Sequence, residues 1–145
     1  MKQLIKRSKA EERGDILVMG VIFVLPLIAV ALLVVQTSIH VRQYQLAVGV
    51  ANRAARCATT IDEQYLRDSE DGIDFNGIPG LLDAAKVKAN VCAAGRPDIT
   101  YIDAVVNASD PEAIDVIVAY KYPSYFPGFE AGDGTVTGTS SVYHS

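Results

Sequence analysis

The feature that most constrains this chain is an uncharged apolar run of twenty residues, Ile16 to Val35. As an α-helix it is ~30 Å long, which matches the hydrocarbon core of a bilayer. A helix also pairs all of its backbone polar groups internally, as a single span in lipid requires. The run is longer than the apolar region of a cleaved signal peptide, and no Ala-x-Ala sequence follows it. We therefore predict a transmembrane helix over residues 16–35.

Charge divides the chain at the same place. Residues 1–13 carry five basic and two acidic side chains (+3), whereas the remainder carries eight basic and fifteen acidic ones (−7). A basic flank before the apolar run predicts a cytoplasmic segment over residues 1–15 and an extracytoplasmic remainder. The acidic remainder has no cluster of Lys and Arg to neutralise phosphates, so nucleic acid is excluded as a partner.

The helical pattern continues past the apolar run. Apolar residues recur at alternating steps of three and four, which places them on one face of a helix: Val41, Tyr44, Val48, Ala51 and Ala55. We predict a helical extension over residues 36–60 with this stripe as its packing face. Two partners are open for the stripe: neighbouring subunits, or the chain's own C-terminal domain.

The remainder, residues 61–145, is expected to form a small domain that begins with a loop and a helix. Ile61–Pro79 is rich in acidic residues and glycine, which predicts a helix end and a surface loop. Its acids lack the spacing of a calcium-binding loop. Pro79–Ala94 follows as a second helix, with Pro79 in its first turn and Gly95 at its C-terminal cap.

The period then changes to two, which is typical of β-strands. Ile114–Tyr122 alternates apolar and other residues, while Ile99–Asn107 and Thr135–Tyr143 have β-prone compositions. A turn is expected at residues 109–111 and a longer connection over Pro123–Gly134. The predicted fold class is α+β: a long N-terminal transmembrane and stalk helix, a second helix and a small antiparallel three-stranded sheet.

Few residues offer chemistry. The two cysteines, Cys57 and Cys92, lie on the predicted outer side of the membrane, where disulfides persist, so we expect them to be bridged. The two histidines, His40 and His144, have no metal-ligand spacing with these cysteines. We expect no catalytic residue, no cofactor, no metal site and no small-molecule substrate.

Three segments together resemble the TadE-like family of tight-adherence (Flp-type) pilus assembly proteins. Arg13-Gly14 precedes an apolar helix that carries Leu25-Pro26, as in that family. The tract VANRAARC, residues 50–57, is similar to the family's Ala- and Arg-rich tract outside the membrane. The ending is similar to the family's strand, loop and strand, with IDVIVAYKYP at residues 114–123 and TVTGTSSVY at residues 135–143.

This resemblance implies a minor pilin or pseudopilin anchored in the bacterial inner membrane. It would have a cytoplasmic N-terminus and would act in pilus assembly and adhesion, in the filament or in the machinery beneath it. Its implied partners are the lipid bilayer, other pilin-like subunits and the assembly machinery. The implied processing site lies between Gly14 and Asp15. Processed members, however, carry a glutamate where this chain has Met19, which argues against cleavage and favours a full-length anchor.

A second hypothesis is a membrane-anchored binding module for an envelope partner or a glycan. It requires an exposed aromatic surface made of Tyr120, Tyr122, Tyr125 and Phe126. Burial separates the two hypotheses, because aromatic side chains covered by the helices could not bind a ligand.

Overall fold

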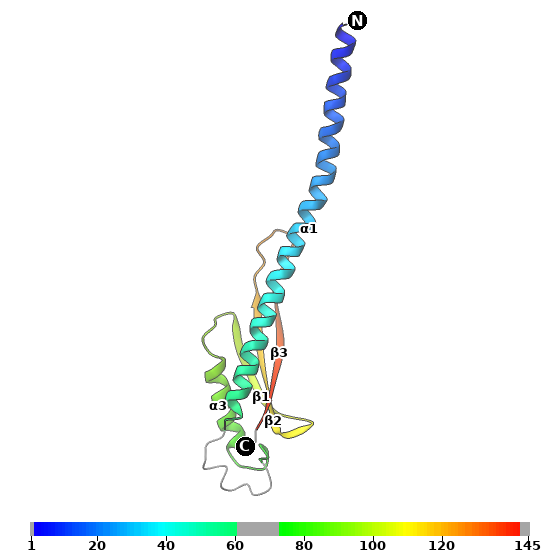
Figure 1. Ribbon diagram of the computed structural model, residues 1–145. Coiled ribbons are helices and arrows are strands. Elements are labelled where there is room, and N and C mark those ends of the chain that lie inside the picture. The colour runs from blue at the N-terminus through cyan, green and yellow to red at the C-terminus, as the bar shows by residue number, and fades with distance from the viewer. Residues whose placement is uncertain (1, 61–72, 143–145) are drawn as a thin grey trace. The chain divides into compact units, whose positions relative to one another are not determined.

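The computed structural model describes residues 2–60 and 73–142, with side chains from residue 18 onward. These residues form two compact units, 1–38 and 39–145. The order of elements is α1 (Lys2–Ala58), α3 (Leu81–Ala93), β1 (Ile99–Asn107), β2 (Asp110–Tyr122) and β3 (Gly132–Ser141). The predicted α+β class is confirmed (Figure 1).

Helix α1 is a single element of 57 residues, with Pro26 inside it. It begins at Lys2, so residues 2–15 of the basic segment, which was predicted only as a charged flank, are also helical. Lys, Arg, Gln, Glu, Leu and Ala predominate there, and all of them have high helix propensity. The helix ends at Ala58, where the Thr59 amide donates to the Ala55 carbonyl at 3.1 Å.

The sheet is an antiparallel meander in the order β1-β2-β3. Strand β1 has the predicted bounds, whereas β2 begins four residues before the predicted Ile114. The reason is a tight hairpin: Asn107 pairs with Asp110, so the turn lies at residues 108–109, one position before the predicted one. Pro111 is tolerated in the central strand because pairing with β3 begins only at Ala113.

The predicted alternation in β2 is confirmed, since Ile114, Val116, Val118 and Tyr120 are all buried. Strand β3 pairs with β2 from Gly132 to Ser141. It therefore begins three residues before the predicted Thr135, and the end of the predicted strand at Tyr143 lies outside the described residues.

The second helix is shorter than predicted. Helix α3 begins at Leu81, so Pro79 precedes it and does not lie in its first turn. Gly95 follows the C-cap residue Ala94 and has a φ of 114°, a conformation that favours glycine at a helix end.

The described part of the loop predicted over residues 61–79 has no helix or strand and is mostly exposed, but two of its side chains are buried. Residues 61–72 lie outside the described residues, but Ile73 and Phe75 are each only 1% exposed. The Phe75 amide donates to the Pro111 carbonyl at 3.4 Å, which joins this segment to the start of β2. Because most of the segment is acidic or glycine, its composition did not indicate that these two apolar side chains belong to the core.

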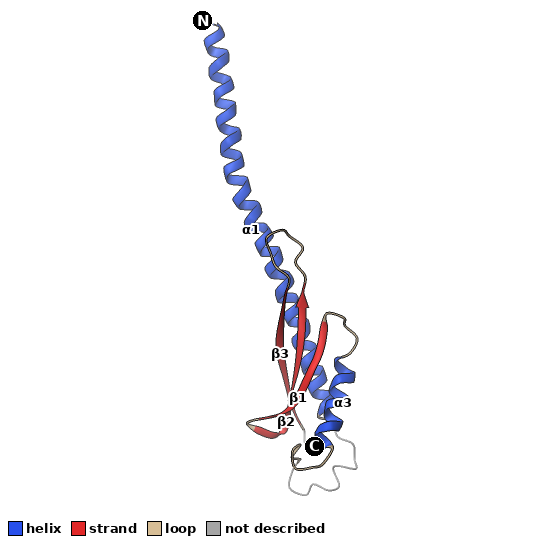
Figure 2. Ribbon diagram, turned by 180° about the vertical axis from the view of Figure 1, so that it is seen from behind, coloured by secondary structure: helices blue, strands red, loops and turns tan. Residues whose placement is uncertain are grey.

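The core lies between α1, α3 and one face of the sheet. The part of α1 that enters the core is almost entirely alanine: Ala47, Val50, Ala51, Ala54, Ala55 and Ala58. The sheet supplies the larger side chains. Both ribbon views place β3 on one side of this part of α1 and α3 on the other (Figures 1 and 2).

Small residues allow the backbones of α1 and β3 to approach closely. A Cβ added to Gly138 of β3 would overlap the backbone of Ala51 and Asn52. Nearby, Thr59 and Ser140 share a hydrogen bond between their hydroxyls at 3.2 Å. Glycine at position 138 is therefore required by the space available.

We expect Gly138→Ala to lower the free energy of unfolding by about 1–3 kcal/mol, because the added methyl group forces α1 and β3 apart. The measurement is urea unfolding of the full chain in a mild detergent, followed by the near-UV circular dichroism of the tyrosines. Gly49→Ala is the matched control: Gly49 lies in α1 with no atom near its added Cβ, so this change should stabilise by about 0.5–1 kcal/mol. Equal stability of the Gly138→Ala variant and the unaltered chain would contradict the close approach.

Candidate functional site

The first functional element is the apolar part of α1. Within the described residues it is the one helix long and apolar enough to cross a membrane, and its most apolar stretch is not buried by the rest of the chain. Large apolar side chains stand exposed along it, for example Met19 at 64%, Phe23 at 68% and Leu27 at 71%. This helix is consistent with a single-pass membrane protein. Gly14 and Asp15 lie within α1, and their side chains are outside the description.

The second element is the predicted stripe on the extension of α1, and the structure divides it. Ala51 and Ala55 are 0% exposed in the chain's own core, Val48 packs at the edge of that core, and Val41 and Tyr44 are each 48% exposed. The buried face of α1 also includes Ala47, Val50 and Ala54, which were not part of the predicted stripe. Of the two partners left open for the stripe, the chain's own domain therefore covers Ala51 and Ala55, whereas Val41 and Tyr44 stay exposed. Alanine and valine do not differ enough to show which side of the helix faces the sheet.

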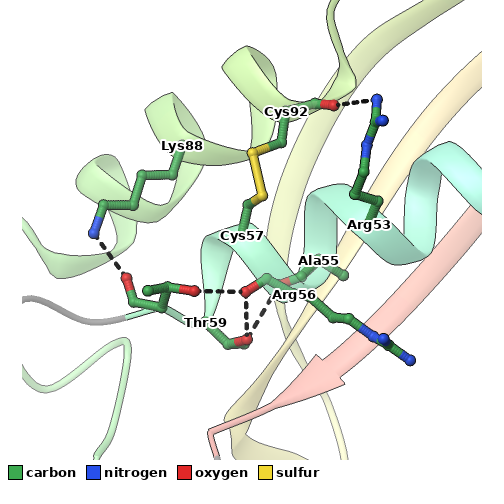
Figure 3. Close-up of a disulfide and its surroundings, with 8 residues drawn as sticks. Arg53, Ala55, Arg56, Cys57, Thr59, Lys88 and Cys92 are labelled. Atoms are coloured by element: carbon green, nitrogen blue, oxygen red, sulfur yellow. Dashed lines mark hydrogen bonds between the residues drawn. A yellow bond between two sulfur atoms is a disulfide. The ribbon is translucent and has the colours of Figure 1, made fainter.

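The third element is the junction between α1 and α3. Cys57 and Cys92 form a disulfide with a Cα–Cα distance of 6.4 Å (Figure 3). The Arg53 guanidinium donates to the Cys92 carbonyl at 2.9 Å, and the Lys88 ammonium donates to the Thr60 carbonyl at 2.7 Å. The covalent bond and these two hydrogen bonds hold α3 antiparallel along the end of α1.

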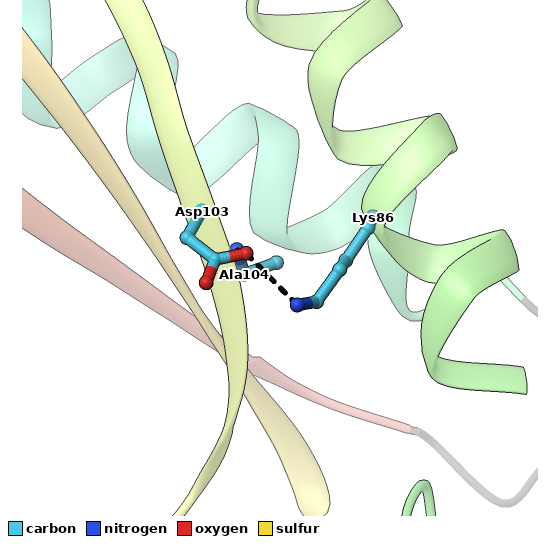
Figure 4. Close-up of polar contacts among 3 residues, drawn as sticks. All are labelled: Lys86, Asp103 and Ala104. Carbon is cyan, nitrogen blue, oxygen red and sulfur yellow. Dashed lines mark hydrogen bonds and ion pairs between the residues drawn. The ribbon is translucent and has the colours of Figure 1, made fainter.

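An ion pair holds α3 to the sheet. The Lys86 ammonium lies 3.0 Å from a carboxylate oxygen of Asp103 on β1, and the Ala104 amide donates to the same oxygen at 2.8 Å (Figure 4). The hydrogen bond from Lys86, followed by that from Ala104, lowers the pKa of Asp103 below its usual value. The same bond to Asp103 raises the pKa of Lys86. Both side chains are more than a third exposed, so the pair adds little to stability.

Aromatic side chains gather where α1 passes the end of β2, which pairs with the start of β3. The His40 ring stacks on Tyr122 with centroids 4.3 Å apart, and its Nε2 shares a hydrogen bond with the Tyr120 hydroxyl at 3.1 Å. Tyr44 meets Tyr120 edge to face at 6.1 Å. Burial is the main cause that raises the pKa of Tyr120, followed by the charges of Tyr122 and Tyr44. His40 is thus part of an aromatic cluster that sequence reasoning missed, because its partners lie 80 residues away in the chain.

The four aromatic residues of the second hypothesis are not all exposed. Tyr120 is only 5% exposed, and Tyr122 and Phe126 are half-buried. Tyr125, at 67%, is the one large aromatic side chain among the four that stands free in solvent. The exposed surface of four aromatic residues that the second hypothesis requires does not form, because β2 turns Tyr120 and Tyr122 toward His40 of α1.

Two open grooves lie at opposite ends of the sheet. One encloses about 870 Å³ among polar residues, including Arg56, Thr59 and Ser140. The other encloses about 640 Å³ between Gln43 of α1, the start of β1 and the loop between β2 and β3. Among the described residues, no three His, Cys, Asp or Glu side chains gather in a way that could hold a metal ion.

Comparison of the chain with protein-family models, with curated proteins and with solved structures found no match.

Replacement of both cysteines, Cys57→Ser with Cys92→Ser, should lower the free energy of unfolding by ~3–4 kcal/mol. The bridge joins positions 35 apart and so restricts a long loop in the unfolded chain. Urea unfolding in detergent measures the change, and reduction of the unaltered chain should produce a loss of the same size. A loss below about 1 kcal/mol in both samples would show that the bridge restricts the unfolded chain far less than its loop length implies.

The Lys86–Asp103 pair should be visible in a pH titration followed by the carboxyl ¹³C shift of Asp103. In Lys86→Met, the pKa of Asp103 should rise toward its usual value. Lys88→Met, two positions further along α3, removes a charge from another side of the helix and should leave that pKa low. Because the folded-state pKa is depressed, the contribution of Asp103 is present above the unfolded-state pKa near ~3.9 and is lost as the pH falls through the folded value. An unchanged pKa in Lys86→Met would refute the pairing.

Proposed function

We propose that this chain is a membrane-anchored, pilin-like subunit for assembly of a tight-adherence pilus, and that it acts by helix packing and not by catalysis. The observation that carries the proposal is that one helix combines two surfaces. Its first part is exposed and apolar, and its later part forms a small-residue face on which an antiparallel sheet packs. The resemblance of residues 13–26, 50–57 and 114–143 to the TadE-like family supports the same function.

The first surface explains how such a subunit would be retained and released. Transfer of each large apolar side chain from water to an apolar environment is worth about 1.5–3 kcal/mol. With exposed side chains along residues 18–35, the helix is held in lipid and can leave it only for an equally apolar place. Helices of neighbouring subunits provide such a place, so retention in the membrane and incorporation in a filament depend on the same residues.

The later part of α1 keeps a smaller surface for neighbours. Ala51 and Ala55 are covered by the chain's own sheet, which leaves Val41 and Tyr44 as the exposed part of the predicted stripe. Val41 makes the sharper test, because Tyr44 also contacts Tyr120 within the aromatic cluster.

The glycan- or envelope-binding hypothesis is the weaker one. It depended on four exposed aromatic side chains, and Tyr120 is almost completely buried against α1. A single exposed side chain, Tyr125, does not make a specific protein-binding or glycan-binding surface.

Deletion of the gene should abolish surface filaments and adherence, and the unaltered chain should restore both. Val41→Gln should fail to restore most filaments, because a polar amide replaces an apolar contact with a neighbouring subunit. The adjacent Arg42→Gln, which is also exposed but points to another side of α1, should restore them. Filaments are counted by electron microscopy, and the intact disulfide of each variant on a non-reducing gel shows that it has folded. Normal filaments in the deletion strain would refute the proposed function.

A further inference from the structure

Helix α3 has one face that the rest of the described chain leaves uncovered. Val87 and Val91 on this face are 64% and 70% exposed, although both are apolar. They are four positions apart and therefore lie on the same side of the helix. Ala84, three positions before Val87, lies on that side as well. We call these three residues the valine face of α3.

The two residues beside Val87 show which way the valine face points. Lys86 reaches Asp103 of β1, and Lys88 donates to the Thr60 carbonyl just after the end of α1 (Figures 3 and 4). Successive residues turn by about 100° around a helix. Because its two neighbours reach the sheet on one side and the end of α1 on the other, Val87 points away from both. The buried positions of α3 lie on the opposite side: Leu81, Ala85, Ala89 and Ala93.

The spacing of the valine face is that of a coiled-coil seam. Ala84, Val87 and Val91 follow one another by three and then four positions, which corresponds to a, d and a of a heptad. In this heptad Asp83 occupies position g and Lys88 occupies position e. In a parallel pair of helices, a g residue lies beside the e residue of the other helix that is five positions further on. Two parallel copies of α3 therefore place Asp83 of each beside Lys88 of the other.

These charges favour one partner and one direction of pairing. A parallel pair of identical helices makes the contact between Asp83 and Lys88 twice, and each contact joins opposite charges. In an antiparallel pair, position g lies beside g and e beside e, so these two side chains do not meet. The Lys88 ammonium group has three N–H donors, and its bond to the Thr60 carbonyl is compatible with an acid of a second copy.

We propose that the valine face of α3 binds the same face of a second copy of this chain, with the two helices parallel. The valines of the two copies pack against each other, and Ala84 leaves room for the helices to approach. The contact is smaller than the interface of a stable dimer of soluble proteins. The inference therefore rests on the membrane anchoring in the proposed function, which concentrates the chains in one bilayer, and it adds the surface by which one copy meets the next.

The test is disulfide cross-linking of the full chain in vesicles of phosphatidylcholine. Val87→Cys places a thiol in the seam, where residue 87 of one copy faces residue 87 of the other, so mild oxidation should join them rapidly. Thr100→Cys is the matched control, because Thr100 is exposed on β1 outside the valine face and should react only through random collisions. Both chains keep the Cys57–Cys92 bridge. Remaining thiols are alkylated, and non-reducing gels then measure the dimer.

Charge variants made in the Val87→Cys chain test the direction of pairing. Asp83→Lys should slow dimer formation roughly tenfold, because two attractive contacts between exposed charges become repulsive. Asp133→Lys makes the same change of charge at an exposed residue of β3 and should leave the rate unchanged. Addition of Lys88→Asp to Asp83→Lys restores opposite charges and should recover most of the rate. Near-UV circular dichroism shows whether each variant has kept its fold.

Three results would overturn the inference. Cross-linking of Val87→Cys that is no faster than that of Thr100→Cys would leave the valine face to a different protein. Equal rates for Asp83→Lys and Asp133→Lys would exclude the parallel, charge-paired arrangement. The third result is a folded double variant that stays as slow as Asp83→Lys. A chain that fails to remain in the vesicles would instead refute the anchor, so failure of the α3 contact and failure of the proposed function are distinguishable.

Discussion

The unit of residues 39–145 depends on the close approach between the alanine face of α1 and the sheet. Because Ala51 and Gly138 bring two backbones together, little room is left for side chains between the helix and β3. The larger side chains of β2 fill the remaining space. Phe75, whose amide donates to the Pro111 carbonyl at the start of β2, is buried in the same core. A domain of this size has a small core, so the disulfide to α3 contributes an important share of its stability.

The same contact decides which surfaces remain for other molecules. Once the sheet covers Ala47, Ala51 and Ala54, the part of α1 after Ser38 presents Val41 and Tyr44 together with polar residues. The residues up to and including Ser38 form a unit of their own, and its large apolar side chains over residues 18–35 are exposed. Membrane anchoring and subunit packing are therefore proposed for parts of one helix that the sheet does not bury, and the folding of the sheet does not compete with either.

Periodicity and composition predicted the elements of the fold better than their contacts. The strand Ile99–Asn107, the alternation of Ile114 to Tyr120 and the pairing of the two cysteines follow from local pattern and compartment, and each is confirmed. The predictions that failed concern contacts between segments that are far apart in the chain. The loop that holds Phe75 has a polar sequence but enters the core, and the aromatic residues of β2 face α1 because the sheet docks with that side inward.

The sequence by itself determined the long apolar helix, the change from a helical to a strand period, and the two cysteines, because each depends on neighbours along the chain. Only the tertiary structure decided which side of α1 is buried, since alanine is compatible with either side and the docked sheet selects one. It likewise brought His40 to Tyr120 and Tyr122, across a distance in the chain that no local pattern records.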